Sequence, residues 1–217
     1  VKNPLNAMAL HLDLLRAKAE RASNGQRAGM QAHIEVLSHE IERLDRVVRT
    51  FLDFSRPVEL QLKPADLSAR ARGVAQLAEA EAESLGIEIV VAAPQPGPQA
   101  WIDRDLIEQA LLNLVNNGLQ AMQPAAAGRQ LALEVGGSAT QAHIRIRDQG
   151  PGVPPEHRDK IFDLYFTTRA SGTGIGLAMA ARTMQLHHGS LELEDALAGA
   201  GASFVLRFPR HANEDAA

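Results

Sequence analysis

Two asparagines four residues apart are the first candidates for chemistry. Asn113 and Asn117 lie in the segment NLVNNGLQAM, which is otherwise largely apolar. Residues four apart share one face of a helix, and buried amides are costly unless a polar group meets them. Amide oxygens suit Mg²⁺, a hard cation that keeps water and phosphate oxygens among its ligands. The pair therefore predicts a magnesium site or, alternatively, a hydrogen bond between helices, while Asn116 is expected to point elsewhere.

A second candidate is the sequence DQGPG at residues 148–152, which follows the alternating segment HIRIR. An Asp followed by glycines is typical of a turn. The same residues also suit base recognition, because a buried carboxylate beside backbone exposed by glycines can accept a hydrogen bond from an exocyclic amine such as that of adenine. Asp148 is therefore the candidate base reader, with Gly150 and Gly152 beside it.

The third candidate is the glycine-rich segment GTGIGL at residues 172–177, which precedes an apolar helical pattern. Alternate glycines let backbone N–H groups approach phosphate oxygens, and the helix dipole favours negative charge there. The spacing differs from the dinucleotide fingerprint, and the sequence contains no G-x-x-x-x-G-K-[ST] loop. A flexible helix entrance is the alternative interpretation.

The elements that must position these residues fall into two regions with different periods. Residues 1–54 repeat apolar positions in steps of three and four around an Asn-Gly turn signal, which predicts a helical hairpin. Its apolar seams need a partner, so a dimeric four-helix bundle is expected, with packing on the chain's own second region as the alternative. The second region predicts an α/β sandwich with helices on one face of a mixed sheet. Its expected helices are 66–86, 104–122 and 171–188, and its expected strands are 87–93, 100–103, 130–137, 142–148, 190–196 and 202–209.

Composition excludes several classes of protein. A chain of 217 residues that is 45% hydrophobic can form one or two domains with a sizeable core. A net charge of -4 without a basic tract argues against nucleic acid and anionic membranes as partners. The absence of cysteine excludes disulfides and thiolate metal sites. No apolar run approaches the roughly 20 residues of a membrane span, so these residues are not expected to contact a membrane.

The order of the motifs resembles one family. The succession NLVNNG, DQGPG, IFDLYFTT and SGTGIGLA closely resembles the N, G1, F and G2 boxes of the histidine-kinase catalytic domain, a Bergerat-fold ATPase. The segments KNPLN and EIERLDRVVRTFLDFSR resemble the dimerisation and phosphotransfer hairpin of the same kinases. The resemblance implies an α+β chain with the phosphotransfer hairpin at 1–56, a linker at 57–65, the Bergerat-type α/β sandwich at 66–210 and a tail at 211–217.

The resemblance also implies ATP and Mg²⁺ as ligands. Asn117 matches the metal ligand, Asn113 a polar group near the phosphates, and Asp148 the adenine reader. Ser203, which precedes Phe204, matches a position where many members carry a Thr that supports this Asp. The other nucleotide contacts implied are Gly150, Gly152, Thr168, Arg169, Gly172, Thr173, Gly174, Gly176 and Leu177.

The sequence departs from the family pattern at several positions. Gln120 stands where many relatives carry a Lys facing the phosphates, so Arg169 in the short lid TTRAS is expected to supply the cation. His39, in LSHEIERL, imitates a phosphoacceptor but lacks the Asn-Pro-Leu continuation and is not expected to accept phosphate. The pair at 187–188 ends a predicted helix, and metal binding there would need a third ligand.

The family phosphoacceptor motif is His-Glu-x-x-Asn-Pro-Leu, which the first five residues match only from Asn3 onward. The acceptor histidine and its adjacent Glu are therefore expected upstream of Val1. Taken alone, Asn3 and Pro4 would predict a helix start, whereas the resemblance places Pro4 inside a helix. Asn3 then matches the residue that in many members orients water for dephosphorylating the partner regulator.

The implied function is transfer of the ATP γ-phosphoryl group to that histidine and then to an Asp of a response regulator, within a homodimer. The resemblance implies that this kinase core lies in the cytoplasm. It is also compatible with a full-length protein that is associated with the inner membrane. One alternative is a nucleotide-binding dimeric scaffold without kinase activity. Another, disfavoured by the hairpin, is a chaperone-like or topoisomerase-like ATPase of the same fold.

Overall fold

The chain divides into two compact units, Val1–Val58 and Glu59–Ala217. The computed structural model describes residues 59–123, 128–169, 172–194 and 201–209 of the second unit, and Leu12, Leu15, Arg16, Ile34, Leu37, Ser38 and Ile41 of the first. These residues of the first unit are all helical. Leu12 and Ile34 are buried together, and Ile41 packs against them, as expected where two apolar seams meet. Asn3 and His39 lie outside the described residues.

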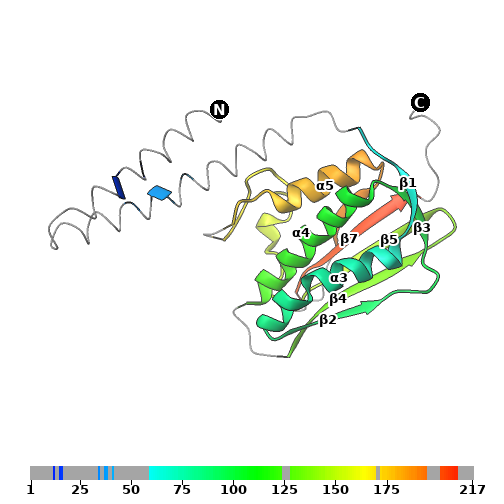
Figure 1. Ribbon diagram of the computed structural model, residues 1–217, viewed down its shortest axis with the longest axis horizontal. Coiled ribbons are helices and arrows are strands. Elements are labelled where there is room, and N and C mark those ends of the chain that lie inside the picture. Colours follow the sequence, from blue (N-terminus) through cyan, green and yellow to red (C-terminus); the bar gives the residue numbers. More distant parts are fainter. Residues whose placement is uncertain are drawn as a thin grey trace. The chain divides into compact units, whose positions relative to one another are not determined.

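The described part of the second unit is a five-stranded mixed sheet with three helices on one face (Figure 1). The strand order is β2-β4-β5-β7-β6, in which β2 runs parallel to β4 and the other neighbours are antiparallel. The strands are β2 Ile87–Ala92, β4 Arg129–Gly137, β5 Gln141–Arg147, β6 Ser190–Glu194 and β7 Ser203–Pro209. The helices are α3 Leu67–Ser84, α4 Arg104–Met122 and α5 Gly176–Leu186, and the predicted sandwich is confirmed.

The core lies between the sheet and the helices because alternate residues of each strand point the same way. Leu133 of β4 pairs in register with Ile146 of β5, and both are buried. The next layer pairs Ile144 with Leu206 of β7, again both buried. Opposite them, α4 buries its apolar face, which comprises Ile107, Ala110, Leu111, Leu114, Val115, Gly118, Leu119 and Met122.

A short antiparallel ribbon is formed by β1 Lys63–Asp66, which directly precedes α3, and β3 Gln99–Ile102, which comes just before α4. The last three residues of the predicted linker lie in β1. Pro64 is compatible with this strand because a two-stranded ribbon leaves one side of each strand without a partner. The ribbon also fixes a helix start, since Asp66 caps α3 by accepting a hydrogen bond from the Ala69 N–H at 3.0 Å.

The predicted glycine-led helix begins later than expected. Gly172 and Gly174 lie in a loop, and α5 starts only at Gly176. Gly174 has a φ of 65°, a left-handed conformation that cannot continue an α-helix. The glycines therefore shape the approach to the helix rather than its first turn.

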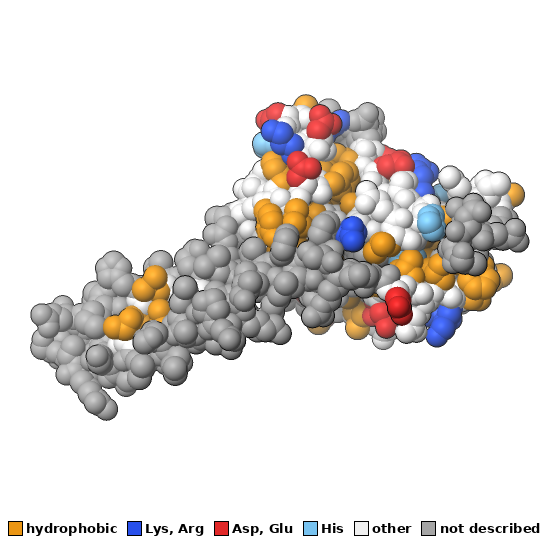
Figure 2. Space-filling view, turned by 90° about the horizontal axis from the view of Figure 1, so that it is seen from above, with side chains coloured by type: hydrophobic (Ala, Val, Ile, Leu, Met, Phe, Trp, Pro, Cys, Tyr) orange, Lys and Arg blue, Asp and Glu red, His pale blue; other side chains and the backbone are white. Residues whose placement is uncertain are grey.

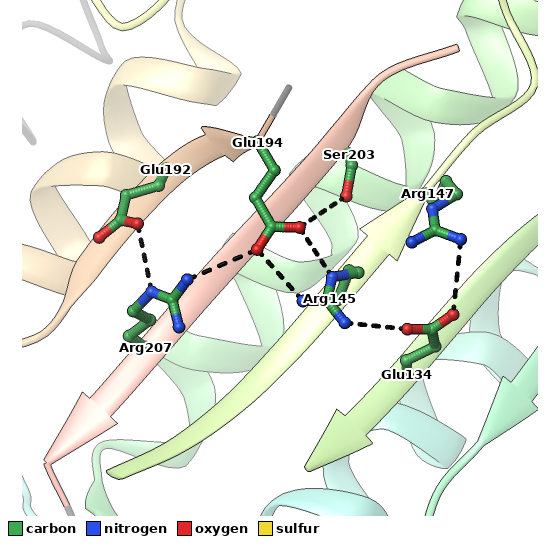
Figure 3. Close-up of polar contacts among 7 residues, drawn as sticks. All are labelled: Glu134, Arg145, Arg147, Glu192, Glu194, Ser203 and Arg207. Carbon is green, nitrogen blue, oxygen red and sulfur yellow. Dashed lines mark hydrogen bonds and ion pairs between the residues drawn. The ribbon is translucent and has the colours of Figure 1, made fainter. Parts of the chain in front are cut away.

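The other face of the sheet carries a lattice of ion pairs (Figure 3). Arg145 of β5 binds Glu194 of β6 through two hydrogen bonds of 2.9 and 3.1 Å and contacts Glu134 of β4 at 3.0 Å. Arg207 adds contacts to Glu192 and Glu194. Beneath this lattice Val205 is fully buried. In another view of the molecule, described acidic and basic side chains are interspersed (Figure 2). Among the described residues, no helix is long and apolar enough to cross a membrane.

A buried histidine ties the end of α5 to the start of α4. His187 Nδ1 lies 2.7 Å from the Thr183 carbonyl oxygen, and the Asp103 N–H donates to His187 Nε2 at 2.9 Å. A carbonyl can only accept and an N–H can only donate, so His187 is neutral with its proton on Nδ1. Burial lowers the pKa of His187, while the Thr183 bond and the Asp103 charge oppose this shift. A proton on Nε2 would break the Asp103 bond.

We predict that the second unit loses stability in mild acid through His187. Below about pH 6.5, the usual histidine pKa, the unfolded chain gains a proton that the folded site resists. The free energy of unfolding therefore decreases as the pH is lowered. His187→Gln should cost about 1–3 kcal/mol at pH 8 and flatten this decline. Urea denaturation followed by fluorescence of Trp101, the single tryptophan, measures both effects.

The matched control is His188→Asn, because His188 is exposed and Asn tolerates its left-handed φ of 54°. This variant should keep the acid decline. An acid decline of equal steepness in the wild-type chain and in His187→Gln would contradict the assignment.

Candidate functional site

A cavity of about 340 Å³ brings together most of the residues singled out in the sequence. This volume lies in the range typical of small-molecule sites. Its lining comes from α4, from the turn after β5, from the lid and the start of α5, and from the start of β7. The predicted residues that line it are Asn113, Asn117, Asp148, Gly152, Thr168, Arg169, Gly172, Thr173, Gly174, Gly176 and Leu177.

Asp148 is the buried polar centre of the cavity, with only 3% of its surface exposed. Its Oδ1 accepts hydrogen bonds from the Gly150 N–H at 2.8 Å and from the Ala202 N–H at 3.1 Å. Burial raises the pKa of Asp148, and these two N–H groups and the Arg169 charge oppose that shift. Because both donors converge on Oδ1, Oδ2 is the oxygen on which a ligand donor is expected. Gly150 thus acts on the carboxylate from outside the cavity lining.

Two left-handed glycines allow the backbone to close around this centre. Gly201 has a φ of 82°, and a Cβ there would collide with the Asp148 carbonyl. Gly174 has a φ of 65°, and a Cβ there would collide with the Tyr165 carbonyl group. The Tyr165 N–H donates to the Gly174 carbonyl at 2.8 Å, which joins the two ends of the lid. Side chains at either glycine would therefore displace the cavity wall.

Another part of the cavity lining contains amides and one cation, Arg169. Asn113 Nδ2 donates to the Gly176 carbonyl at 3.4 Å, which places it beside the start of α5. Arg169 donates from Nη1 to Gln120 Oε1 at 2.9 Å and from Nη2 to the Asn117 carbonyl at 3.0 Å. Burial lowers the pKa of the Arg169 guanidinium and Asp148 raises it, but arginine stays charged at neutral pH. This group of amides with the Arg169 guanidinium suits an anion.

The structure corrects the predicted role of Ser203. Its hydroxyl donates to Glu194 Oε2 at 3.3 Å, within the ion-pair lattice of Figure 3. Phe204 faces the core, and successive strand residues point to opposite faces, so Ser203 points away from the cavity. The support for Asp148 that was assigned to Ser203 comes instead from the backbone N–H of Ala202.

Several residues that the sequence does not single out as site residues also line the cavity. Asn116 was expected to point elsewhere, yet it lies in the lining, three residues after Asn113 and hence on a neighbouring part of the same helix surface. His157 and Phe166 also line it, with ring centroids 5.4 Å apart in an edge-on arrangement. Ala202 had no side-chain signal, because its contribution is a backbone N–H.

The donor set fits a nucleotide better than a metal held by protein alone. Among the described residues, no three acidic or histidine side chains form a group able to hold a metal ion. Asn117 offers an amide oxygen in the cavity, which is a hard ligand of the kind Mg²⁺ accepts alongside water and phosphate. A magnesium ion would therefore need a phosphate-bearing ligand to complete its shell.

The helix-covered mixed sheet and this cavity define the ATP-binding domain class that histidine kinases share with DNA gyrase B. A family model described as histidine kinase-, DNA gyrase B-, and HSP90-like ATPase matches residues 102–212. A second, described as the His Kinase A (phospho-acceptor) domain, matches residues 1–59. The chain belongs to the sensor histidine kinases.

Individual relatives agree with this assignment. The chain is 33% identical over 211 residues to the sensor histidine kinase ZraS of Escherichia coli K12, covering 96% of this chain and 43% of ZraS. Full-length ShkA, solved in complex with AMPPNP, is 27% identical with a TM-score of 0.67, covering 97% of this chain and 44% of that chain. ThkA, solved with the response regulator protein TrrA, shares the fold at 21% identity and a TM-score of 0.71, covering 97% and 60%. The chain thus spans less than half the length of ZraS.

We predict that Asp148→Asn weakens binding of adenine nucleotides by about tenfold to a hundredfold, because an amide group replaces one acceptor oxygen with a donor that faces the adenine amine. Calorimetric titration with ADP measures the change. Ser203→Ala is the matched control, since its hydroxyl binds Glu194 on the opposite face, and it should retain wild-type affinity. The reverse ranking of the two variants would show that the Asp148 assignment is wrong.

Proposed function

We propose that the second unit binds ATP, with adenine against Asp148 and the phosphates toward Arg169 and the start of α5. The observation that carries this proposal is the buried Asp148 carboxylate, which holds two backbone N–H groups on one oxygen and offers the other to the cavity. A carboxylate can accept a hydrogen bond from the exocyclic amine of adenine. The AMPPNP complex of ShkA supports an adenine nucleotide as the ligand.

The phosphate end is proposed to act through backbone and amide groups. Gly174 and Gly176 bring N–H groups toward the ligand, and the dipole of α5 favours negative charge at its first turn. Asn117 is the proposed Mg²⁺ ligand, and Asn113 holds the adjoining helix start. When bound, Mg²⁺ would neutralise charge on the phosphate oxygens.

We further propose that the whole protein is a histidine kinase of a two-component system. A histidine imidazole attacks the γ-phosphorus, a phosphorus–nitrogen bond forms, and ADP leaves as its phosphorus–oxygen bond breaks. The protein contributes chiefly alignment and charge stabilisation. The acceptor is proposed to precede Val1, because residues 1–5 match the family motif only after its histidine and glutamate.

Passage of the phosphoryl group to an Asp of a response regulator completes the proposed reaction. The first unit matches the phospho-acceptor domain, and ThkA of the same fold was solved with a response regulator. The first unit has an apolar seam that includes Leu12, Ile34 and Ile41, and such a seam suits a homodimeric four-helix bundle. Asn3 is proposed to orient water when the regulator is dephosphorylated.

We predict that Asn117→Ala removes the Mg²⁺ dependence of ATP binding. The wild-type chain should bind ATP more tightly with Mg²⁺ than with a chelator present, because Asn117 would hold the ion and the ion would offset the negative charge of the phosphates. Calorimetry under both conditions makes the comparison, with Gln76→Ala, which removes an exposed amide on α3 outside the cavity lining, as the matched control. An unaltered Mg²⁺ effect in Asn117→Ala would remove this residue from the metal site.

We also predict that residues 1–217 alone bind nucleotide but do not phosphorylate themselves. Transfer needs the acceptor within roughly 3–3.5 Å of phosphorus, a geometry that only the motif histidine is expected to reach. Incubation with radiolabelled ATP should give acid-labile label only when the chain also carries the protein's own residues upstream of Val1. Label on residues 1–217 that disappears in His39→Gln would identify His39 as the acceptor instead.

A further inference from the structure

Gln120 and Arg169 form a contact between α4 and the lid at the edge of the cavity. Arg169 Nη1 donates to Gln120 Oε1 at 2.9 Å, while Nη2 donates to the Asn117 carbonyl at 3.0 Å. All three residues line the cavity. Gln120 follows Asn113 and Asn117 by seven and three residues, so the three amides lie along one side of α4. The guanidinium is therefore fixed at the same end as the amides proposed to meet the phosphates.

Arg169 differs from Arg145 of the sheet in the charge of the groups that accept its hydrogen bonds. Arg145 gives its donors to the carboxylates of Glu194 and Glu134, which offset its charge. The two acceptors that hold Arg169 are an amide oxygen and a peptide oxygen, and both are neutral. They fix the direction of the guanidinium. The Asp148 carboxylate, which also lines the cavity, offsets part of its charge, and the rest of that charge is available to an anion. Half-buried charge of this kind attracts an anion more strongly than charge in bulk water does.

We propose that Gln120 is a positioning residue that holds the Arg169 guanidinium toward the polyphosphate of the bound nucleotide without cancelling its charge. The proposal rests on the nucleotide site proposed above and adds the division of labour between two residues. The cation comes from the lid, and α4 supplies the neutral acceptor that aims it. A carboxylate at position 120 would hold Arg169 more firmly but neutralise it, and an apolar side chain would leave it free to move.

Two variants at position 120 separate the aiming of Arg169 from simple packing. Gln120→Glu keeps an acceptor for Arg169, so a purely structural role predicts unchanged or tighter ATP binding. The proposal predicts the opposite, a loss of ATP affinity on the order of tenfold, because the charge is cancelled. Gln120→Leu should lose affinity for ATP by a smaller factor. Adenosine, which has no phosphates, should bind both of these variants as it binds the wild-type chain.

A double-mutant cycle decides whether Gln120 acts through Arg169. Gln120→Leu should weaken ATP binding in the wild-type background and have no further effect in Arg169→Met. Gln76 is an exposed glutamine on α3, so Gln76→Leu is the matched control and should leave the affinities for ATP and for adenosine unchanged. Calorimetry with ATP and with adenosine supplies every value in the cycle.

The outcomes separate this inference from the proposed function. If the wild-type chain binds neither ATP nor adenosine, the nucleotide site itself is wrong and this inference falls with it. If the wild-type chain binds both, then wild-type ATP affinity in Gln120→Glu overturns the role of Gln120 alone. Equal losses from Gln120→Leu with and without Arg169 would likewise overturn it, because Gln120 would then act on the nucleotide directly.

Discussion

The buried carboxylate of Asp148 is the constraint on which the rest of the site depends. A carboxylate at the end of β5 can remain buried only if donors meet it, and the Gly150 and Ala202 N–H groups do so on one oxygen. Their approach requires backbone without side chains, which explains why Gly201 is left-handed against the Asp148 carbonyl. Ala202, the residue immediately before β7, is thereby held to the end of β5. The hydrogen bonds that hold the proposed base-recognising carboxylate also join the end of β5 to the start of β7.

The helix α4 connects the turn that contains Asp148 to the amide side chains that line the cavity. Its N-cap is Asp103, whose N–H donates to the buried His187, and its last residue is Met122, whose sulfur accepts the Gln149 N–H at 3.3 Å. Both ends of the helix are thus tied, one to α5 and one to the turn that contains Asp148. Asn117 and Gln120 lie between these anchors, so their distance from the Asp148 carboxylate is fixed by helix geometry rather than by loops.

Much of this arrangement follows from the sequence, and the errors have physical causes. Apolar periodicity predicts α4 because its buried face is long and regular, and alternation predicts the strands with one face in the core. The strand β1 is not predicted because it contains Pro64, and proline is rare in strands that have neighbours on both sides. Ser203 was placed on the wrong face, although its neighbour Phe204 is a core residue and alternation assigns Ser203 to the opposite face. Ala202 could not be found from its side chain, because it acts through its backbone.

The most direct test of the account compares ATP with inosine triphosphate by calorimetry on the wild-type chain. The two ligands share ribose and phosphates, but inosine carries an oxygen where adenine carries the amine proposed to donate to Asp148. The account predicts that inosine triphosphate binds about tenfold to a hundredfold more weakly, because a carboxylate would then face an acceptor. Equal affinity for the two nucleotides would contradict the central claim that Asp148 recognises the adenine amine.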